Sequence, residues 1–227
     1  MSPPDKGNSV SNPSALVINA ARAFIEEESS AVHDIADQID ETFVRVADLV
    51  LRGTGKVVIT GAGTSGFIAR RAAHLFSVSG TPAFFLNPTD GLHGSMGVLE
   101  PDDILIAMSK GGGSSEVNEL VDRSRTNGVT VVALTCAPES RLGTSADITV
   151  ALREFPSADP GALIAMGSTL AHGSWLDALA LVIMRARGFE WERVHYIHPG
   201  GAVGQLSTLP EQVAPLEIPT FESEPRS

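Results

Sequence analysis

The chain of 227 residues carries a formal net charge of −11 and 43% hydrophobic residues, which fits one α/β domain with extra helices and a full core. The acidic balance argues against general nucleic-acid binding, because such binding needs lysine and arginine to neutralise phosphates. No apolar run approaches the ~20 residues of a membrane span, and the single cysteine, Cys136, excludes an internal disulfide and is expected to be a buried, inert thiol.

The first fifty residues divide into a polar start and a helical region. Residues 1–12 are rich in Pro, Ser, Asn and Gly, a composition typical of disorder, and they lack the apolar stretch of a secretory signal. A reducing cytoplasm is therefore the expected location. From Pro13 to Arg52, apolar spacing of three and four residues predicts two helices. The first carries Leu16, Ala20, Ala23 and Phe24, and the second carries Val32, Ile35, Ile39, Phe43, Val46 and Val50 on one face.

Strand-like and helix-like segments alternate through the rest of the chain. Buried strands are predicted at 57–60, 83–86, 104–108, 130–135 and 148–151, and helices at 67–79, 115–127, 140–144 and 162–187. This alternation predicts a mostly parallel sheet with helices on both faces. The expected domain spans residues 13–206. The tail, residues 207–227, contains four prolines and several acids, and we expect it to be disordered.

Two loops rich in small and hydroxylated residues each lie between a predicted strand and a helix. Glycines let the backbone approach a ligand, and free N–H groups at a helix start point toward an anion. In such sheets ligands sit outside the carboxyl ends of strands, where the strand order reverses. The loops therefore predict a bound phosphorylated small molecule. The candidate ligand-binding residues are Gly63, Thr64 and Ser65 in the first loop and Ser109, Lys110, Ser114 and Ser115 in the second.

The first loop also matches the glycine spacing of a dinucleotide fingerprint, Gly61-x-Gly63-x-x-Gly66. That fingerprint expects an acidic residue at the end of the next strand, but here the strand ends in Asn87-Pro88. The hydroxyls of Thr64 and Ser65 suit a terminal phosphate better, so a phosphosugar is favoured over a nucleotide. A tight strand–helix turn without a ligand stays open for this loop.

Six segments of the sequence form a recognisable set. They are Gly61–Gly66, Gly80–Phe85, His93-Gly94, Ser109–Glu116, Arg187–Phe189 and His198–Gly204. Together they resemble the sugar isomerase (SIS) domain, and within it the arabinose-5-phosphate isomerases, over about Ala15 to Leu206. The resemblance implies a three-layer αβα sandwich with a five-stranded, mostly parallel sheet, assembled as a homotetramer. It also implies aldose–ketose isomerisation of a sugar phosphate through an enediol without metal or organic cofactor, in a stand-alone form that lacks regulatory CBS domains.

Three residues are candidates for proton transfer. Glu116, in the first turn of the helix after the second loop, is the candidate base, and the resemblance places its counterpart in the family's active site. The alternative is an acid that only complements the helix dipole. His93 and His198 each precede flexible residues and suit ring opening or proton relay near neutral pH. The alternative for each is a structural histidine at a turn, and a metal site would need a third ligand that the sequence does not identify. By resemblance, His198 reaches the site from a neighbouring subunit.

Departures from the family pattern concern the substrate more than the fold. Thr64 stands where arabinose-5-phosphate isomerases carry lysine, and Ser157 stands where they carry a glutamate. The second loop has Lys110–Gly113 in place of the usual Ser/Asn-x-Ser-Gly-Glu character. One interpretation is compensation, in which Lys110 supplies the missing cation and neutralises the phosphate. The alternative is a Lys110 side chain that points into solvent.

The sequence therefore predicts an aldose–ketose isomerase of the arabinose-5-phosphate/ribulose-5-phosphate type, whose partners are a sugar phosphate and copies of itself, with no nucleic acid or membrane. One alternative is a non-catalytic phosphosugar sensor. Sensors of this superfamily usually carry a DNA-binding helix-turn-helix, whereas residues 1–12 are too short for one and Pro13–Arg52 is acidic. The other alternative is a 6-phospho-3-hexuloisomerase, a class that lacks the His93-Gly94 and His198-Pro199 motifs.

Overall fold

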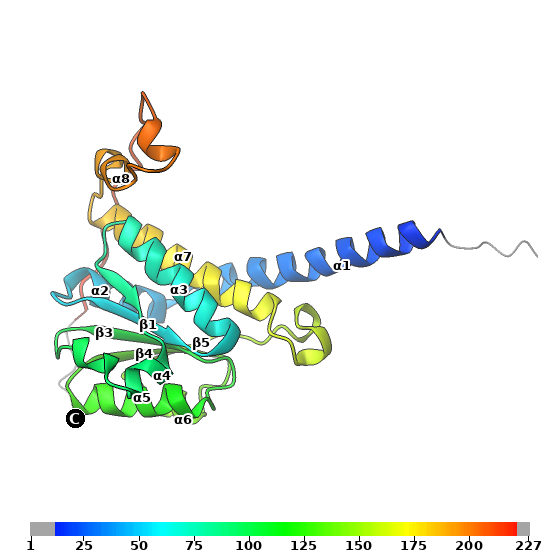
Figure 1. Cartoon of the computed structure of the whole chain (residues 1–227), viewed down its shortest axis with the longest axis horizontal. Helices are drawn as coiled ribbons and strands as arrows, with labels where there is room; N and C mark the ends of the chain where they lie inside the picture. The colour runs from blue at the N-terminus through cyan, green and yellow to red at the C-terminus, as the bar shows by residue number, and fades with distance from the viewer. Residues whose placement is uncertain (1–11, 222–227) are drawn as a thin grey trace, which may run out of the picture.

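A single parallel sheet forms the centre of the molecule (Figure 1). The structure, a computed structural model, describes residues 12–221; the expected disorder of residues 1–11 and 222–227 lies outside the described residues. Every neighbouring pair of strands is parallel, in the order β2-β1-β3-β4-β5. The strands are β1 (Val57–Gly61), β2 (Ala83–Phe85), β3 (Ile104–Met108), β4 (Thr130–Thr135) and β5 (Ile148–Ala151). The five predicted strands and the αβα sandwich are thus confirmed.

Helices cover both faces of the sheet, as buried parallel strands require. One face carries α2 (Glu41–Arg52), α3 (Gly63–Val78), α7 (Gly167–Ala186) and the C-terminal end of α1 (Pro13–Asp34). The other carries α4 (Pro88–Leu92), α5 (Ser115–Thr126) and α6 (Arg141–Ser145). A further short helix, α8 (Trp191–Ile197), follows α7.

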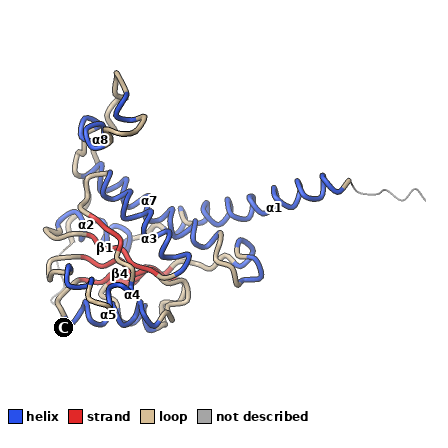
Figure 2. The backbone as a smooth tube through the Cα atoms, viewed as in Figure 1, coloured by secondary structure: helices blue, strands red, loops and turns tan. Residues whose placement is uncertain are grey.

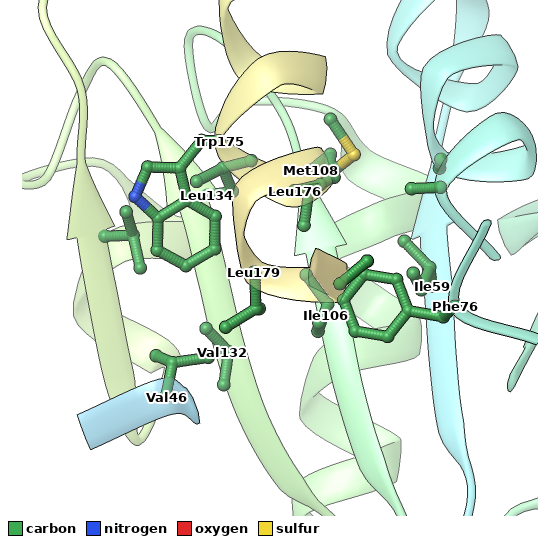
Figure 3. Packing of buried hydrophobic residues seen from close by; sticks show 14 of the residues in the cluster. Val46, Ile59, Phe76, Ile106, Met108, Val132, Leu134, Trp175, Leu176 and Leu179 are labelled. Atoms are coloured by element: carbon green, nitrogen blue, oxygen red, sulfur yellow. The ribbon is translucent and has the colours of Figure 1, made fainter. Parts of the chain in front are cut away.

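Side chains alternate along each strand and so divide the apolar core in two. Ile59, Ile106 and Val132 point toward α3 and α7, where they meet Phe76 and Leu179 (Figure 3). The residues between them on the strands, with Leu120 and Val121 of α5, build the second core. This alternation also decides on which side of the sheet each residue at a strand end lies.

The N-terminal helix α1 projects from the body of the molecule (Figure 1). Ala31, near its C-terminal end, is its one buried residue, whereas Leu16, Val17 and Ile25 are exposed. The predicted boundary between the first two helices is wrong. Residues 35–40 form a turn that ends where the Asp40 carboxylate caps α2, so the continuous apolar face expected from residue 32 to residue 50 is split between two helices.

The predicted helix from residue 162 to residue 187 is wrong at its start. Gly161 and Ala162 have φ angles of 65° and 56°, which a right-handed helix cannot contain, and α7 begins only at Gly167. Residues 156–158 and 160–162 form two short 3₁₀ turns instead.

The expectation of a disordered tail is also wrong for residues 207–221, which run as loop along the molecule (Figure 2). Proline removes backbone donors, but the carbonyl groups of the tail still accept hydrogen bonds from side chains of the body. The Arg185 Nε donates to the carbonyl of Ala214 at 2.8 Å, and an Arg52 N–H donates to the carbonyl of Phe221 at 2.6 Å. Ile218 packs against the core on the face of the sheet that carries α2 and α7. None of the helices within residues 12–221 has the length and apolar character needed to cross a bilayer.

Candidate functional site

Both glycine-rich loops lie at the point where the strand order reverses. Strands β1 and β3 are neighbours, but α3 leaves β1 toward one face and α5 leaves β3 toward the other. The loops begin side by side there, because Gly61 at the end of β1 pairs with Met108 at the end of β3. Sheets of this kind bind ligands at this crevice. The structure therefore brings the two loops together as the sequence predicted.

The first loop opens directly into α3. Gly66 must be glycine, because a Cβ there would lie 2.6 Å from the carbonyl oxygen of Gly61, and Gly63 has a φ of 54°. No side chain caps the start of α3. Thr64 is exposed and Ser65 is buried in the first turn. The first backbone N–H groups of α3 thus face the crevice without an intrahelical partner.

The second loop is held firmly but leaves the start of α5 open. Gly112, with a φ of 63°, packs against Ser140, and its carbonyl accepts a hydrogen bond of 3.0 Å from the Asn118 side-chain amide. Ser114 occupies the N-cap position of α5 without capping the helix, and its hydroxyl lies 3.3 Å from that of Ser109. By contrast, side chains cap α2, α4 and α6. The two helices at the crevice are therefore free to bind an anion.

Glu116 stands beside this group of serines. It is the second residue of α5 and partly exposed, and the Ser115 hydroxyl donates to its carboxylate at 3.2 Å. The predicted base is thus next to the predicted phosphate donors Ser114 and Ser115. An acid at this position also complements the positive end of the helix dipole, so its place in the helix is stable without a ligand.

Lys110 matches neither of the alternatives expected for it. Its ammonium lies 2.7 Å from the carboxylate of Asp159, whose side chain is fully buried. The other Asp159 oxygen accepts the backbone N–H groups of Met166 and Ser168 at the start of α7. Lys110 is therefore neither a free cation for the phosphate nor a solvent-pointing side chain. No sequence motif pointed to Asp159 as its partner, because 49 residues separate the two.

A contact between a half-buried thiol and a buried imidazole adjoins this ion pair. The Cys136 Sγ lies 3.3 Å from the His172 Nε2. Burial, with the nearby Glu154 carboxylate, raises the pKa of the Cys136 thiol to about 11, so it stays protonated and unreactive. Burial, with the Lys110 charge, lowers the pKa of His172 to about 4, so its ring is neutral. The raised pKa agrees with the inert thiol expected of Cys136, but the side chain is half-buried rather than buried.

His93 and His198 lie in very different places. His93 is exposed at the C-terminal end of α4, a helix that packs on α5 where Gly91 meets Leu120. His198 follows α8, and its Nδ1 lies 2.7 Å from the carbonyl oxygen of Val194.

The long helix α7 separates His198 from the crevice. Its start holds Asp159 near Lys110, and its 20 residues span about 30 Å to an end where Phe189 packs on Gly80. The structure thus brings Glu116 and the serines together but leaves His198 of the same chain far from them. Within residues 12–221, no group of three or more histidine, cysteine or acidic side chains is arranged to hold a metal ion.

Comparison with known proteins gives consistent matches. The profile of the SIS domain matches residues 50–182. The chain is 35% identical over 192 residues to the arabinose 5-phosphate isomerase KdsD of Pseudomonas aeruginosa, covering 85% of this chain and 59% of the relative. It is 34% identical over 191 residues to GutQ of Escherichia coli K12, also an arabinose 5-phosphate isomerase, covering 84% of this chain and 60% of the relative. The chain thus spans about three-fifths of the length of these curated relatives. The structure of E. coli CFT073 c3406 in complex with arabinose 5-phosphate matches with a TM-score of 0.79 and 29% identity, over 83% of this chain and 100% of that chain.

Proposed function

Because this chain belongs to the SIS domain family, we propose that it is an aldose–ketose isomerase of a sugar phosphate, of the arabinose-5-phosphate/ribulose-5-phosphate type. The observation that carries the proposal is the place of Glu116 beside two uncapped helix starts at one crevice. The printed activity of the relatives and the arabinose 5-phosphate bound to the structural neighbour support this substrate class. A cytoplasmic location belongs to the same proposal.

The phosphate binds between the two loops in this proposal. The backbone N–H groups at the starts of α3 and α5 donate to its oxygens, and so do the hydroxyls of Ser65, Ser109, Ser114 and Ser115. Both helix dipoles favour the negative charge. With Lys110 paired to Asp159, the phosphate is held by uncharged donors and helix ends rather than by a lysine. The overall charge of −11 makes this crevice a local exception to the field of the protein.

Glu116 performs the proton transfer in this proposal. Its carboxylate takes the proton from C2 of the open-chain sugar, and the electron pair forms the carbon–carbon double bond of the enediol. The same carboxylate returns the proton at C1 while the hydroxyl proton of O2 is transferred to O1, which leaves the carbonyl at C2 and completes the conversion of aldose to ketose. His93 is the candidate for ring opening or relay, on the side of the sheet that carries α5.

His198 enters this mechanism only from another copy of the chain. In its own chain it lies beyond the far end of α7 from the crevice. The exposed apolar residues of α1 offer surface for assembly, and we propose a homotetramer. Mixing two inactive variants, Glu116→Gln and His198→Asn, tests this, since co-assembled heteromers contain some complete sites. Recovery of activity after co-refolding supports a shared site, and no recovery contradicts it.

The decisive test of the activity is proton exchange on the substrate. The purified protein is incubated in deuterated water with a panel of pentose and hexose phosphates, and proton exchange at the carbon next to the carbonyl group, C2 of an aldose or C1 of a 2-ketose, is followed by NMR. Exchange with a ketose phosphate that disappears in Glu116→Gln is the expected result. Tight binding without exchange across the panel would instead favour a phosphosugar sensor. Exchange confined to hexulose phosphates would favour a 6-phospho-3-hexuloisomerase.

A further inference from the structure

Lys110 lies on the opposite side of the sheet from the serines, although it directly follows Ser109. Met108 belongs to the core beneath α3 and α7, so alternation along the strand turns Ser109 toward α5 and Lys110 toward α7. The contacts agree with this assignment. The Ser109 hydroxyl meets Ser114 at the start of α5, and the Lys110 ammonium meets Asp159 at the start of α7. The serine group and the ammonium thus flank the end of β3 from two sides.

The position of the ammonium is fixed from both ends. The Lys110 carbonyl accepts hydrogen bonds from the Cys136 backbone N–H at 2.9 Å and from the Thr135 hydroxyl at 3.0 Å. Its Nζ is held at 2.7 Å by Asp159, which is itself held by two backbone N–H groups. A flexible lysine side chain held in this way has already lost much of its rotamer freedom before a ligand arrives.

The ammonium retains donors that Asp159 does not use. Lysine has three N–H groups, and among the residues that the structure describes Asp159 is the sole hydrogen-bond partner of the Lys110 Nζ, although the charge of Glu154 also acts on it. The side chain keeps 22% of its surface exposed, so solvent or a ligand reaches it. The hydrogen bond to Asp159, working against burial, raises the pKa of Lys110, so the group stays charged and serves as a donor rather than a base.

We propose that Lys110 contacts the reacting end of the sugar and stabilises the negative charge that develops on its carbonyl oxygen. This inference rests on the proposed isomerase function. When Glu116 removes the C2 proton, the freed electron pair forms the carbon–carbon double bond and the carbonyl π electrons move onto oxygen. The Lys110 ammonium donates a hydrogen bond to that enediolate oxygen and keeps its own proton. The sugar phosphate then has its phosphate between the starts of α3 and α5 and its carbonyl oxygen at the Lys110 ammonium, beside the end of β3.

The pair also explains why a fully buried carboxylate is retained beside the crevice. Asp159 holds the ammonium in place before the substrate binds, so little reorganisation is needed when charge develops. The charge of Asp159 itself stays compensated by Lys110 and by the N–H groups of Met166 and Ser168. Asp159 is thus a positioning residue, and Lys110 is the group that touches the substrate.

The experiment compares Lys110→Met with a matched variant at the opposite end of the strands. Lys56 forms a similar pair with the buried Asp103, at 2.9 Å, so Lys56→Met removes an equivalent ion pair far from the crevice. Deuterium exchange at C1 of ribulose 5-phosphate gives the rate at saturation, and ³¹P NMR titration gives the dissociation constant of inorganic phosphate. We expect Lys110→Met to slow exchange at least about 100-fold, as for loss of one oxyanion donor, while phosphate affinity changes less than about threefold. Lys56→Met changes neither quantity.

The outcomes separate this inference from the proposed function. Because Lys110→Met leaves the Asp159 charge buried and uncompensated, the double variant Lys110→Met/Asp159→Asn serves where the single variant does not fold. Normal exchange in either variant overturns the role of Lys110 and leaves the isomerase proposal standing. A tenfold loss of phosphate affinity also overturns it, because Lys110 is then a phosphate ligand. No exchange in the wild type with any sugar phosphate overturns the proposed function, and the enediolate role with it.

Discussion

His172 makes the stability of this protein depend on pH in a way that one substitution removes. The ring is 1% exposed on α7, and its Nε2 lies 3.3 Å from the Cys136 Sγ. Burial is the main cause that lowers its pKa from 6.5 to about 4, and the Lys110 charge adds to it, while Asp159 opposes them. His172→Gln keeps a polar side chain beside the thiol but cannot titrate.

The direction of the effect follows from the lowered pKa. Above pH 6.5 the ring is neutral in both folded and unfolded chains, and its contribution to stability is fully present. Between pH 6.5 and about 4 the unfolded chain binds a proton that the folded chain does not, so stability falls as the pH falls. Each pH unit in this window costs at most about 1.4 kcal/mol, which gives roughly 2–3 kcal/mol between pH 7.5 and 4.5.

Urea unfolding of both proteins at half-unit steps from pH 7.5 to 4.5 measures this effect. All other titrating groups are shared, so the difference in unfolding free energy between wild type and His172→Gln isolates the histidine. We expect this difference to move by roughly 2–3 kcal/mol against the wild type as the pH falls. A difference that stays constant within about 0.5 kcal/mol refutes the reasoning, as does an NMR titration of the His172 ring in the folded protein near its ordinary pKa.

Three further predictions test the loops and the tail. Gly112→Ala should lower the unfolding free energy by about 2–4 kcal/mol, because the φ angle of Gly112 is positive and the new Cβ collides with Ser140. Gly111→Ala places its Cβ in open space and should lower the unfolding free energy far less, so equal losses in urea unfolding would contradict this prediction. Ser65→Ala and Ser114→Ala should weaken binding of phosphorylated sugars in calorimetric titrations but leave unphosphorylated sugars unaffected, and equal weakening of both would remove the phosphate assignment. Ile218→Ala should destabilise the protein by about 1 kcal/mol through lost packing on the core, whereas Glu217→Ala, at an exposed position, should not destabilise it. If the two variants unfold at the same temperature, the tail does not pack on the body in solution.

Sequence patterns predicted the sheet well because its causes are local. A parallel strand buried on both faces shows a continuous apolar run, and all five runs became strands in one parallel sheet. The errors lie where local pattern carries little information. The apolar spacing from residue 32 to residue 50 continues through the turn that ends at Asp40, so the sequence pattern does not show the break between the two helices. The composition of the proline-rich tail is typical of disorder, but arginine side chains of the body donate hydrogen bonds to its carbonyl groups.

The candidate site divides in the same way. The sequence alone determined both glycine-rich loops and the place of Glu116, because glycines, small hydroxylated residues and a strand–helix junction are all short-range features. Only the tertiary structure decided what Lys110 does, since its partner Asp159 is 49 residues away and reaches it through the packing of α7 on the sheet. It also placed His198 beyond the far end of α7. Neighbouring residues in the sequence largely set the backbone conformation, whereas a buried charge must be paired, and the partner available to it depends on which distant residues the fold places nearby.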